Sequence, residues 1–143
     1  MRTRPIVVHG LADARMACGA ARDLGTGIVL HSAPGAAANM GPLWFQQIVA
    51  AIEAEYADLA IDAVFDCGDA PGHALAALRQ GLRHIRYAGP AASRHKIVGI
   101  ARRGGARVET APAPPALDPR DHADPAAACR AWLAGETTET RRR

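Results

Sequence analysis

The sequence has few aromatic residues, only one lysine and no closely spaced pair of cysteines. Aromatic residues make up 4% of the 143 positions, so a core must be built mainly from small and aliphatic side chains. The three cysteines, Cys18, Cys67 and Cys129, contain no CxxC pair. Such an odd, widely spaced set argues against a disulfide framework and for a reducing compartment. We therefore expect a cytoplasmic protein.

Long apolar runs and concentrated positive charge are also missing. No apolar run reaches the roughly 18 residues that cross a membrane. The pattern of a strand begins directly after Pro5, so we expect neither a signal peptide nor a membrane partner. The formal net charge is +3, and the arginines are spread along the chain. Because nucleic-acid binders gather basic residues on one face, this spread predicts no nucleic-acid partner.

What the chain does contain is a regular alternation of apolar runs and amphipathic stretches. Five short apolar runs occur, at Ile6–His9, Gly27–His31, Ala60–Asp66, His84–Ala88 and Ala106–Thr110. The first three are nearly continuous, which is typical of strands buried on both faces of a parallel sheet. Stretches with helical spacing separate them, over Ala12–Leu24, Leu43–Tyr56, Gly72–Leu82 and Ala92–Arg103. Gly25 and Gly81 stand where helix C-caps are expected. This order predicts right-handed βαβ units and a parallel sheet.

The chain is expected to divide near residue 111. Residues 1–111 are predicted to form a partial β/α barrel-like domain, because a complete eight-stranded barrel needs about 250 residues. Residues 112–124 are rich in proline and predict an extended linker. A C-terminal helix is predicted over 125–134, with Asp124 as its N-cap, and a disordered basic tail over 135–143.

Polar residues follow several of the predicted strands, and sites in α/β folds form at these strand ends. Asp66, Cys67 and Asp69 come directly after a buried strand. Asp66 is a candidate general base, and Cys67 a candidate nucleophile or soft metal ligand. The alternative is structural: Asp69 caps the next helix, and the small thiol side chain fills space in the core.

Two histidines end the first two predicted strands. His9 and His31 are expected to be adjacent, and together with Cys67 they form a candidate three-ligand metal site. Hydrogen-bonded histidines without a metal are the alternative. The other four histidines are predicted to lie on the surface: His73, His84, His95 and His122.

A loop of small residues follows the second strand, over Ser32–Gly41. Its backbone at Gly35 and Ala36 can approach a phosphate closely, because no large side chain stands in the way. The loop lacks a Walker lysine and a GxGxxG pattern, so nucleotide binding is not predicted.

This loop and its flanks resemble a known family. Ile28–Tyr56 reads IVLHSAPGAAANMGPLWFQQIVAAIEAEY and is similar to the second strand, loop and helix of class II, metal-dependent fructose-bisphosphate and tagatose-bisphosphate aldolases. In register after it, Val64–Asp69 resembles the family's His-Leu-Asp-His-Gly segment, and Ala74–Gly81 its Ala-Ile-x-Ala-Gly helix end. Ile97–Glu109 resembles the helix and fifth strand. The resemblance covers residues 6–111 and implies five β/α units of a TIM-type barrel.

The resemblance implies only part of a catalytic site. Asp66 falls on the family's proton-transfer aspartate, and Cys67 on its first zinc-ligand histidine. Alanines stand where the family has a substrate-contacting serine, an aspartate and a glutamate, at Ala33, Ala88 and Ala111. The family's other two zinc histidines come from strands six to eight, which we expect this chain to lack. An active protein would be an aldolase-like lyase, but zinc is not favoured and the cofactor stays unknown.

Three functions are therefore considered. The first is a non-aldolase member of this fold that binds a small ligand, phosphorylated ligands included, through His9, Ser32, Gly35, Ala36 and Asp69. The second is a residual metal-assisted lyase that uses Asp66 and Cys67. The third is a structural or interaction protein.

The open edges of the predicted sheet also suggest how copies of the chain could associate. Five parallel strands leave two open edges. The sheet either keeps a partial TIM-barrel-like form or relaxes into an open, flavodoxin-like doubly wound arrangement. We expect a homo-oligomer, with Trp44, Phe45 and Trp132 as contact residues; their alternative role is that of core anchors.

Overall fold

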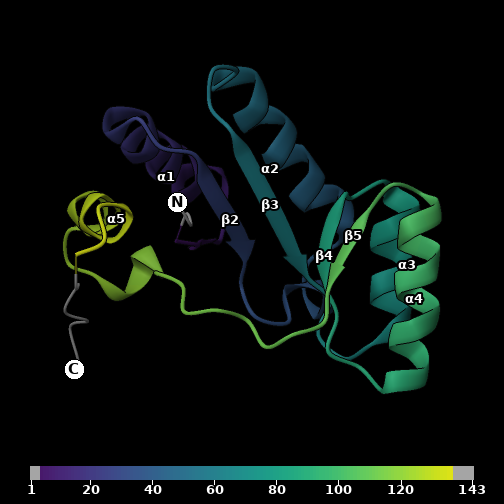
Figure 1. Cartoon of the computed structure of the whole chain (residues 1–143). Helices are drawn as coiled ribbons and strands as arrows, with labels where there is room; N and C mark the ends of the chain where they lie inside the picture. Colours follow the sequence, from purple (N-terminus) through teal and green to yellow (C-terminus); the bar gives the residue numbers. More distant parts are fainter. Residues whose placement is uncertain (1–3, 137–143) are drawn as a thin grey trace. The chain divides into compact units, whose positions relative to one another are not determined.

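The computed structural model describes residues 4–136, in which strands and helices alternate along the chain (Figure 1). The strands are β1 (Ile6–Val8), β2 (Ile28–Ser32), β3 (Ile61–Asp66), β4 (His84–Arg86) and β5 (Arg107–Glu109). The α-helices are α1 (Leu11–Leu24), α2 (Pro42–Glu55), α3 (Pro71–Gln80), α4 (Ala91–Arg103) and α5 (Pro125–Leu133). Two short 3-10 helices complete the fold, η1 (Ala36–Ala38) and η2 (Pro119–Asp121). The residues 137–143 of the predicted tail lie outside the described part.

The five strands form one all-parallel sheet in the order β1-β2-β3-β4-β5. This confirms the predicted α/β class and each predicted strand. The sheet is open rather than closed into a barrel, as the flavodoxin-like alternative expected. Its sequential strand order is that of consecutive units of a β/α barrel.

The contacts of the chain divide it into two compact units. The terminal unit consists of Met1–His31, Ile48–Asp62 and Pro114–Arg143, and the central unit of Ser32–Gln47 and Ala63–Ala113. The sequence had predicted a division of the chain near residue 111 instead. The difference arises because the predicted C-terminal helix packs with the N-terminal segment of the chain rather than standing apart.

Small buried side chains line the contact between α1 and α5 in the terminal unit. Ala14, Ala17 and Cys18 of α1 are fully buried, and α1 packs against α5, where Cys129 is also fully buried. Small side chains let two helices approach closely and still fill the space between them. The low aromatic content is therefore sufficient for this helix pair.

Helix α5 is fixed at both of its ends. Asp124 accepts a hydrogen bond from the Ala127 amide at 3.1 Å, which confirms the predicted N-cap. Near the other end, the Trp132 indole N–H donates to the Pro5 carbonyl at 2.9 Å. The Arg4 guanidinium lies 3.4 Å from the centroid of the same ring and donates to the Trp132 carbonyl. Trp132 thus anchors α5 within its own chain, the alternative role that the sequence allowed.

The proline-rich segment before α5 is attached to β1. Leu117 forms a parallel bridge with Ile6, in which the Val7 amide donates to the Leu117 carbonyl at 2.8 Å and the Leu117 amide to the Pro5 carbonyl at 3.1 Å. Leu117 and Pro119 are buried. The predicted linker therefore contributes to the core of the terminal unit.

The central unit has an aromatic pair at its core. The rings of Phe45 and Phe65 have centroids 5.3 Å apart, and both side chains are buried. Phe65 lies in register with Ile85 of β4, while α3 and α4 pack against β4 and β5. Phe45 is thus a core residue and not the exposed contact that an oligomer would use.

Two local predictions in the central unit are wrong. Helix α3 starts after Ala70 without any side-chain cap, and Asp69 is exposed, so the predicted cap is not formed. His84 was predicted on the surface but is 6% exposed, because it begins β4 and its imidazole contacts Glu109 of β5. Gly81 does end α3 as predicted, in the left-handed conformation with φ at 97°.

The Tyr87 hydroxyl is buried and has no hydrogen-bond partner in residues 4–136. Burying an unpaired hydroxyl costs free energy. We expect Tyr87→Phe to raise the free energy of unfolding by about 1 kcal/mol, measured by urea denaturation. The matched control is Tyr56→Phe, which removes a hydroxyl that donates to the Arg15 carbonyl at 3.2 Å and should not stabilise. A destabilised Tyr87→Phe would contradict the expectation.

Candidate ligand site at the ends of β3, β4 and β5

Three charged residues stand in register at the carboxyl ends of three neighbouring strands. Asp66 of β3 pairs with Arg86 of β4, which pairs with Glu109 of β5. Registered residues on parallel strands about 4.8 Å apart point to the same face of the sheet. The ladder continues past them, since the Cys67 amide donates to the Arg86 carbonyl and the Tyr87 amide to the Glu109 carbonyl, both at 2.9 Å. Asp66, Arg86 and Glu109 therefore form a charged row.

The turn after β3 holds the Asp66 carboxylate in place. Its Oδ1 accepts a hydrogen bond from the Gly68 amide at 2.8 Å, and its own amide donates to Ser32 Oγ at 2.8 Å. Gly68 has φ at 60°, a left-handed conformation that favours glycine. Oδ2 of Asp66 makes no hydrogen bond within the described residues. One carboxylate oxygen is therefore positioned but unused.

Arg86 is a nearly buried cation at the centre of the row. Only 8% of the residue is exposed, and its Nη1 donates to the Ala111 carbonyl at 2.6 Å. Within residues 4–136 its guanidinium makes no ion pair with a carboxylate. A guanidinium has five N–H donors, and burying a charge without a partner is costly. The remaining donors therefore favour an anionic ligand.

The other end of the row contains a buried histidine. His84 Nε2 lies 2.8 Å from Glu109 Oε1, and the Arg107 guanidinium lies 3.3 Å from His84 Nδ1. A guanidinium can only donate, so His84 Nδ1 accepts and Nε2 carries the proton that goes to Glu109. This contact fixes one oxygen of the Glu109 carboxylate.

Cys67 lies next to the row as a neutral thiol. It is 1% exposed, and its Sγ lies 3.8 Å from the Phe65 carbonyl oxygen. Burial, and secondarily the Asp66 charge, raise the pKa of the thiol to about 12. Because the thiolate is the nucleophile, a neutral buried thiol does not suit nucleophilic attack. The structure thus favours the buried-filler alternative for Cys67.

The residues of the predicted metal site have other surroundings. His9 Nε2 lies 2.9 Å from Asp118 Oδ2, and the His9 amide donates to Asp13 Oδ2 at 2.8 Å. His31 is 8% exposed and belongs with His9 to the terminal unit, whereas Cys67 belongs to the central unit. In residues 4–136 no three His, Cys, Asp or Glu side chains are grouped so as to hold a metal ion. Metal binding by Cys67, His9 and His31 stays a prediction without structural support.

The small-residue loop uses part of its backbone for its own structure. The Ala36 amide donates to Ala33 and the Ala38 amide to Gly35, both at 3.0 Å. Gly35 has φ at 66° and starts η1. These two amides are occupied, so a phosphate would need other donors. The predicted ligand contacts at Ser32, Gly35, Ala36 and Asp69 stay predictions.

Arg86 is the site residue that the sequence reading missed. Its signal was present, since a charged residue interrupts the apolar run Ile85 to Ala88 inside a predicted strand. A charge within a buried strand needs a partner, and this one has a single carbonyl.

Comparisons with known proteins do not identify a family or a function for the chain. No family model matches the chain, and no curated protein matches it. The resemblance to class II aldolases therefore stays a prediction. Within the described residues no helix has both the length and the apolar character that a membrane crossing requires.

Proposed function

We propose that the central unit binds a small organic anion at the ends of β3, β4 and β5, with Arg86 as the anion-binding group. The observation that carries the proposal is the nearly buried Arg86 guanidinium, which has one carbonyl acceptor and no carboxylate partner among the described residues. Arginine binds carboxylates and phosphates through two parallel N–H bonds, so either anion fits its geometry.

The two carboxylates beside Arg86 restrict the charge of the ligand that can bind there. Asp66 and Glu109 flank it in the row, and their negative charges disfavour a bare, multiply charged anion. Carboxylate oxygens do accept hydrogen bonds from hydroxyl groups. The ligand that suits the row therefore has one anionic group and adjacent hydroxyls, as in a hydroxy acid or a sugar phosphate.

A residual lyase is the second candidate, in keeping with the resemblance to class II aldolases. The observation in its favour is the positioned Asp66 carboxylate with an unused Oδ2 beside a cation. Such a group can accept a proton from a bound hydroxyl. The lyase predicted from the sequence is metal-assisted and also uses Cys67. Binding of the anion itself does not require a metal, and zinc is not part of the binding proposal.

The cellular setting and assembly are also proposals. All three cysteines are free and buried, which fits a reducing, cytoplasmic compartment. A homo-oligomer would pair through β5, the strand at one end of the sheet. We propose neither a membrane nor a nucleic-acid partner for this ligand site.

The test is thermal unfolding in the presence of glycolate, glycerol 3-phosphate and inorganic phosphate. A ligand at 100 times its dissociation constant stabilises by about 2.7 kcal/mol, which raises the Tm by several degrees. We expect glycolate or glycerol 3-phosphate to give this shift. Arg86→Gln should abolish it, and Arg86→Lys should weaken binding about tenfold, because lysine cannot bind bidentately.

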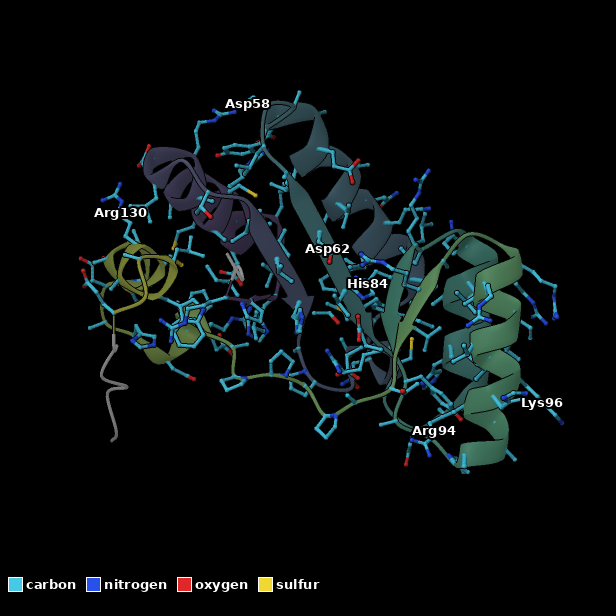
Figure 2. All side chains as sticks on the ribbon, in the orientation of Figure 1. Asp58, Asp62, His84, Arg94, Lys96 and Arg130 are labelled. Carbon is cyan, nitrogen blue, oxygen red and sulfur yellow. The ribbon has the colours of Figure 1, made fainter. Side chains whose placement is uncertain are left out.

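Arg94→Gln is the matched control, since it removes one arginine from α4 of the same unit (Figure 2). It should leave the shift unchanged. Asp66→Asn should keep the affinity for the anion but remove any proton transfer, which separates the two candidate functions. Equal shifts in wild type and Arg86→Gln, with both folded by circular dichroism, would refute the proposal.

A further inference from the structure

A groove lies between the C-terminal parts of α3 and α4 in the central unit, and Arg86 does not line it. It has a volume of 630 Å³ and is lined by the apolar side chains of Leu75, Leu78, Leu82 and Ile100 and by Arg79 and Arg83. Ile100 is 37% exposed. The groove thus combines an open apolar floor with two cationic groups.

The charge around the groove has one sign. Residues 70–108 contain seven arginines, one lysine and no aspartate or glutamate. Arg79 and Arg83 are exposed, and neither side chain makes a hydrogen bond or ion pair within residues 4–136. A binding partner that neutralises this surface must therefore supply carboxylates or phosphates.

Three exposed arginines of the terminal unit are in ion pairs. Arg15 pairs with Glu55 at 2.6 Å, and Arg22 pairs with Asp58 at 2.7 Å. Arg130 pairs with Asp23 at 3.1 Å. Arg79 and Arg83 thus differ from these three arginines, because neither side chain has an ion-pair partner within residues 4–136.

We propose that the groove binds an acidic, amphipathic segment of a partner protein. Its apolar side chains would pack on Leu75, Leu78 and Ile100, as amphipathic helices do in hydrophobic grooves. Its carboxylates would pair with Arg79 and Arg83. The occupant is a protein segment because the floor is apolar and continuous with two charged groups at its rim.

Other occupants fit less well. Single-stranded nucleic acid is bound through aromatic platforms on which bases stack, and no aromatic residue lines the groove. A second copy of this chain would have to supply exposed carboxylates from separate elements, such as Glu53, Asp69 and Asp121, because Asp23, Glu55 and Asp58 are already in ion pairs. The experiment below would detect either of these occupants.

The probe is a fluorescent peptide of about 18 residues, made of leucine and glutamate with the leucines at helical spacing. An isomer of the same composition, with the leucines placed off one face, is the peptide control. We expect saturable binding in fluorescence anisotropy, and at least about tenfold weaker binding of the isomer. Arg79→Gln/Arg83→Gln should weaken binding at least about tenfold, and Ile100→Gln about fivefold.

The matched protein control is Arg94→Gln/Lys96→Gln, which removes the same charge from α4 residues that do not line the groove (Figure 2). It should change affinity by less than about twofold, as distant surface charges do. Equal binding of the two peptides, or equal loss in both double variants, would overturn the proposal. Tighter binding of a thymidine oligonucleotide than of the peptide would also overturn it. So would a dimer that Arg79→Gln/Arg83→Gln dissociates.

Discussion

Raising the pH above 9 is expected to unfold the protein, because its three thiols are buried and neutral. Cys18 and Cys129 are fully buried and Cys67 is 1% exposed. Burial raises the pKa of Cys18 and Cys67 to about 12 and that of Cys129 to about 11, from an ordinary value of 9.0. The charges of Asp66 near Cys67 and Asp13 near Cys129 act in the same direction.

The sign follows from proton binding in the two states. Above pH 9 the unfolded chain has lost its thiol protons, while the folded chain keeps them until the pH approaches 11 to 12. Unfolding then releases protons, so a rise in pH favours it. The contribution of the thiols to the free energy of unfolding is fully present below pH 9. Between pH 9 and the folded-state pKa of each thiol, the free energy of unfolding falls by about 1.4 kcal/mol per pH unit for that thiol. Three thiols give roughly 4 kcal/mol per unit, comparable with the whole stability of a small domain.

Urea denaturation at a series of pH values from 7 to 11, under reducing conditions, measures this effect. The control is the triple variant Cys18→Ala/Cys67→Ala/Cys129→Ala, whose stability should fall much less steeply above pH 9. Its lower stability at pH 7 does not matter, because the comparison is between slopes. Parallel slopes in the two proteins would show that the thiols do not cause alkaline unfolding.

Phe65→Ala is expected to destabilise the protein by about 3–5 kcal/mol. Phe65 is fully buried on β3, stacks with Phe45 at a centroid distance of 5.3 Å and lies in register with Ile85. The control Phe65→Leu keeps most of the volume and should cost less than half as much.

The two tryptophans allow this loss to be assigned to a unit. Trp44 belongs to the central unit and Trp132 to the terminal unit, so variants that keep one tryptophan each report one unit. Because α2 and β3 contribute residues to both units, we expect the two transitions to shift together in Phe65→Ala. A shift seen only by Trp44 would show that the units unfold separately.

Much of the fold could be predicted because its signals are local. The apolar runs place all five strands, and the spacing of apolar residues places all five α-helices, within a few residues of their observed bounds. Gly81 and Asp124 end and begin helices as expected, because capping depends on neighbours in the sequence.

The failures concern contacts between distant residues. His84 was placed on the surface because nothing near it in the sequence shows that Glu109 lies beside it. Leu117 was placed in a linker because its partner is Ile6. Arg86 was not recognised because its significance depends on which residues of other strands do and do not pair with it. Periodicity does not report such pairings.

The bridge between Leu117 and Ile6 has a consequence for solubility. β1 is the first strand of the sheet, and an open edge there would offer its backbone to a strand of another molecule. The segment that covers it carries Pro115 and Pro119, which have no N–H to donate to a further strand. Edge-to-edge growth of aggregates is thereby blocked at β1, and any such association is left to β5 with its charged Arg107 and Glu109.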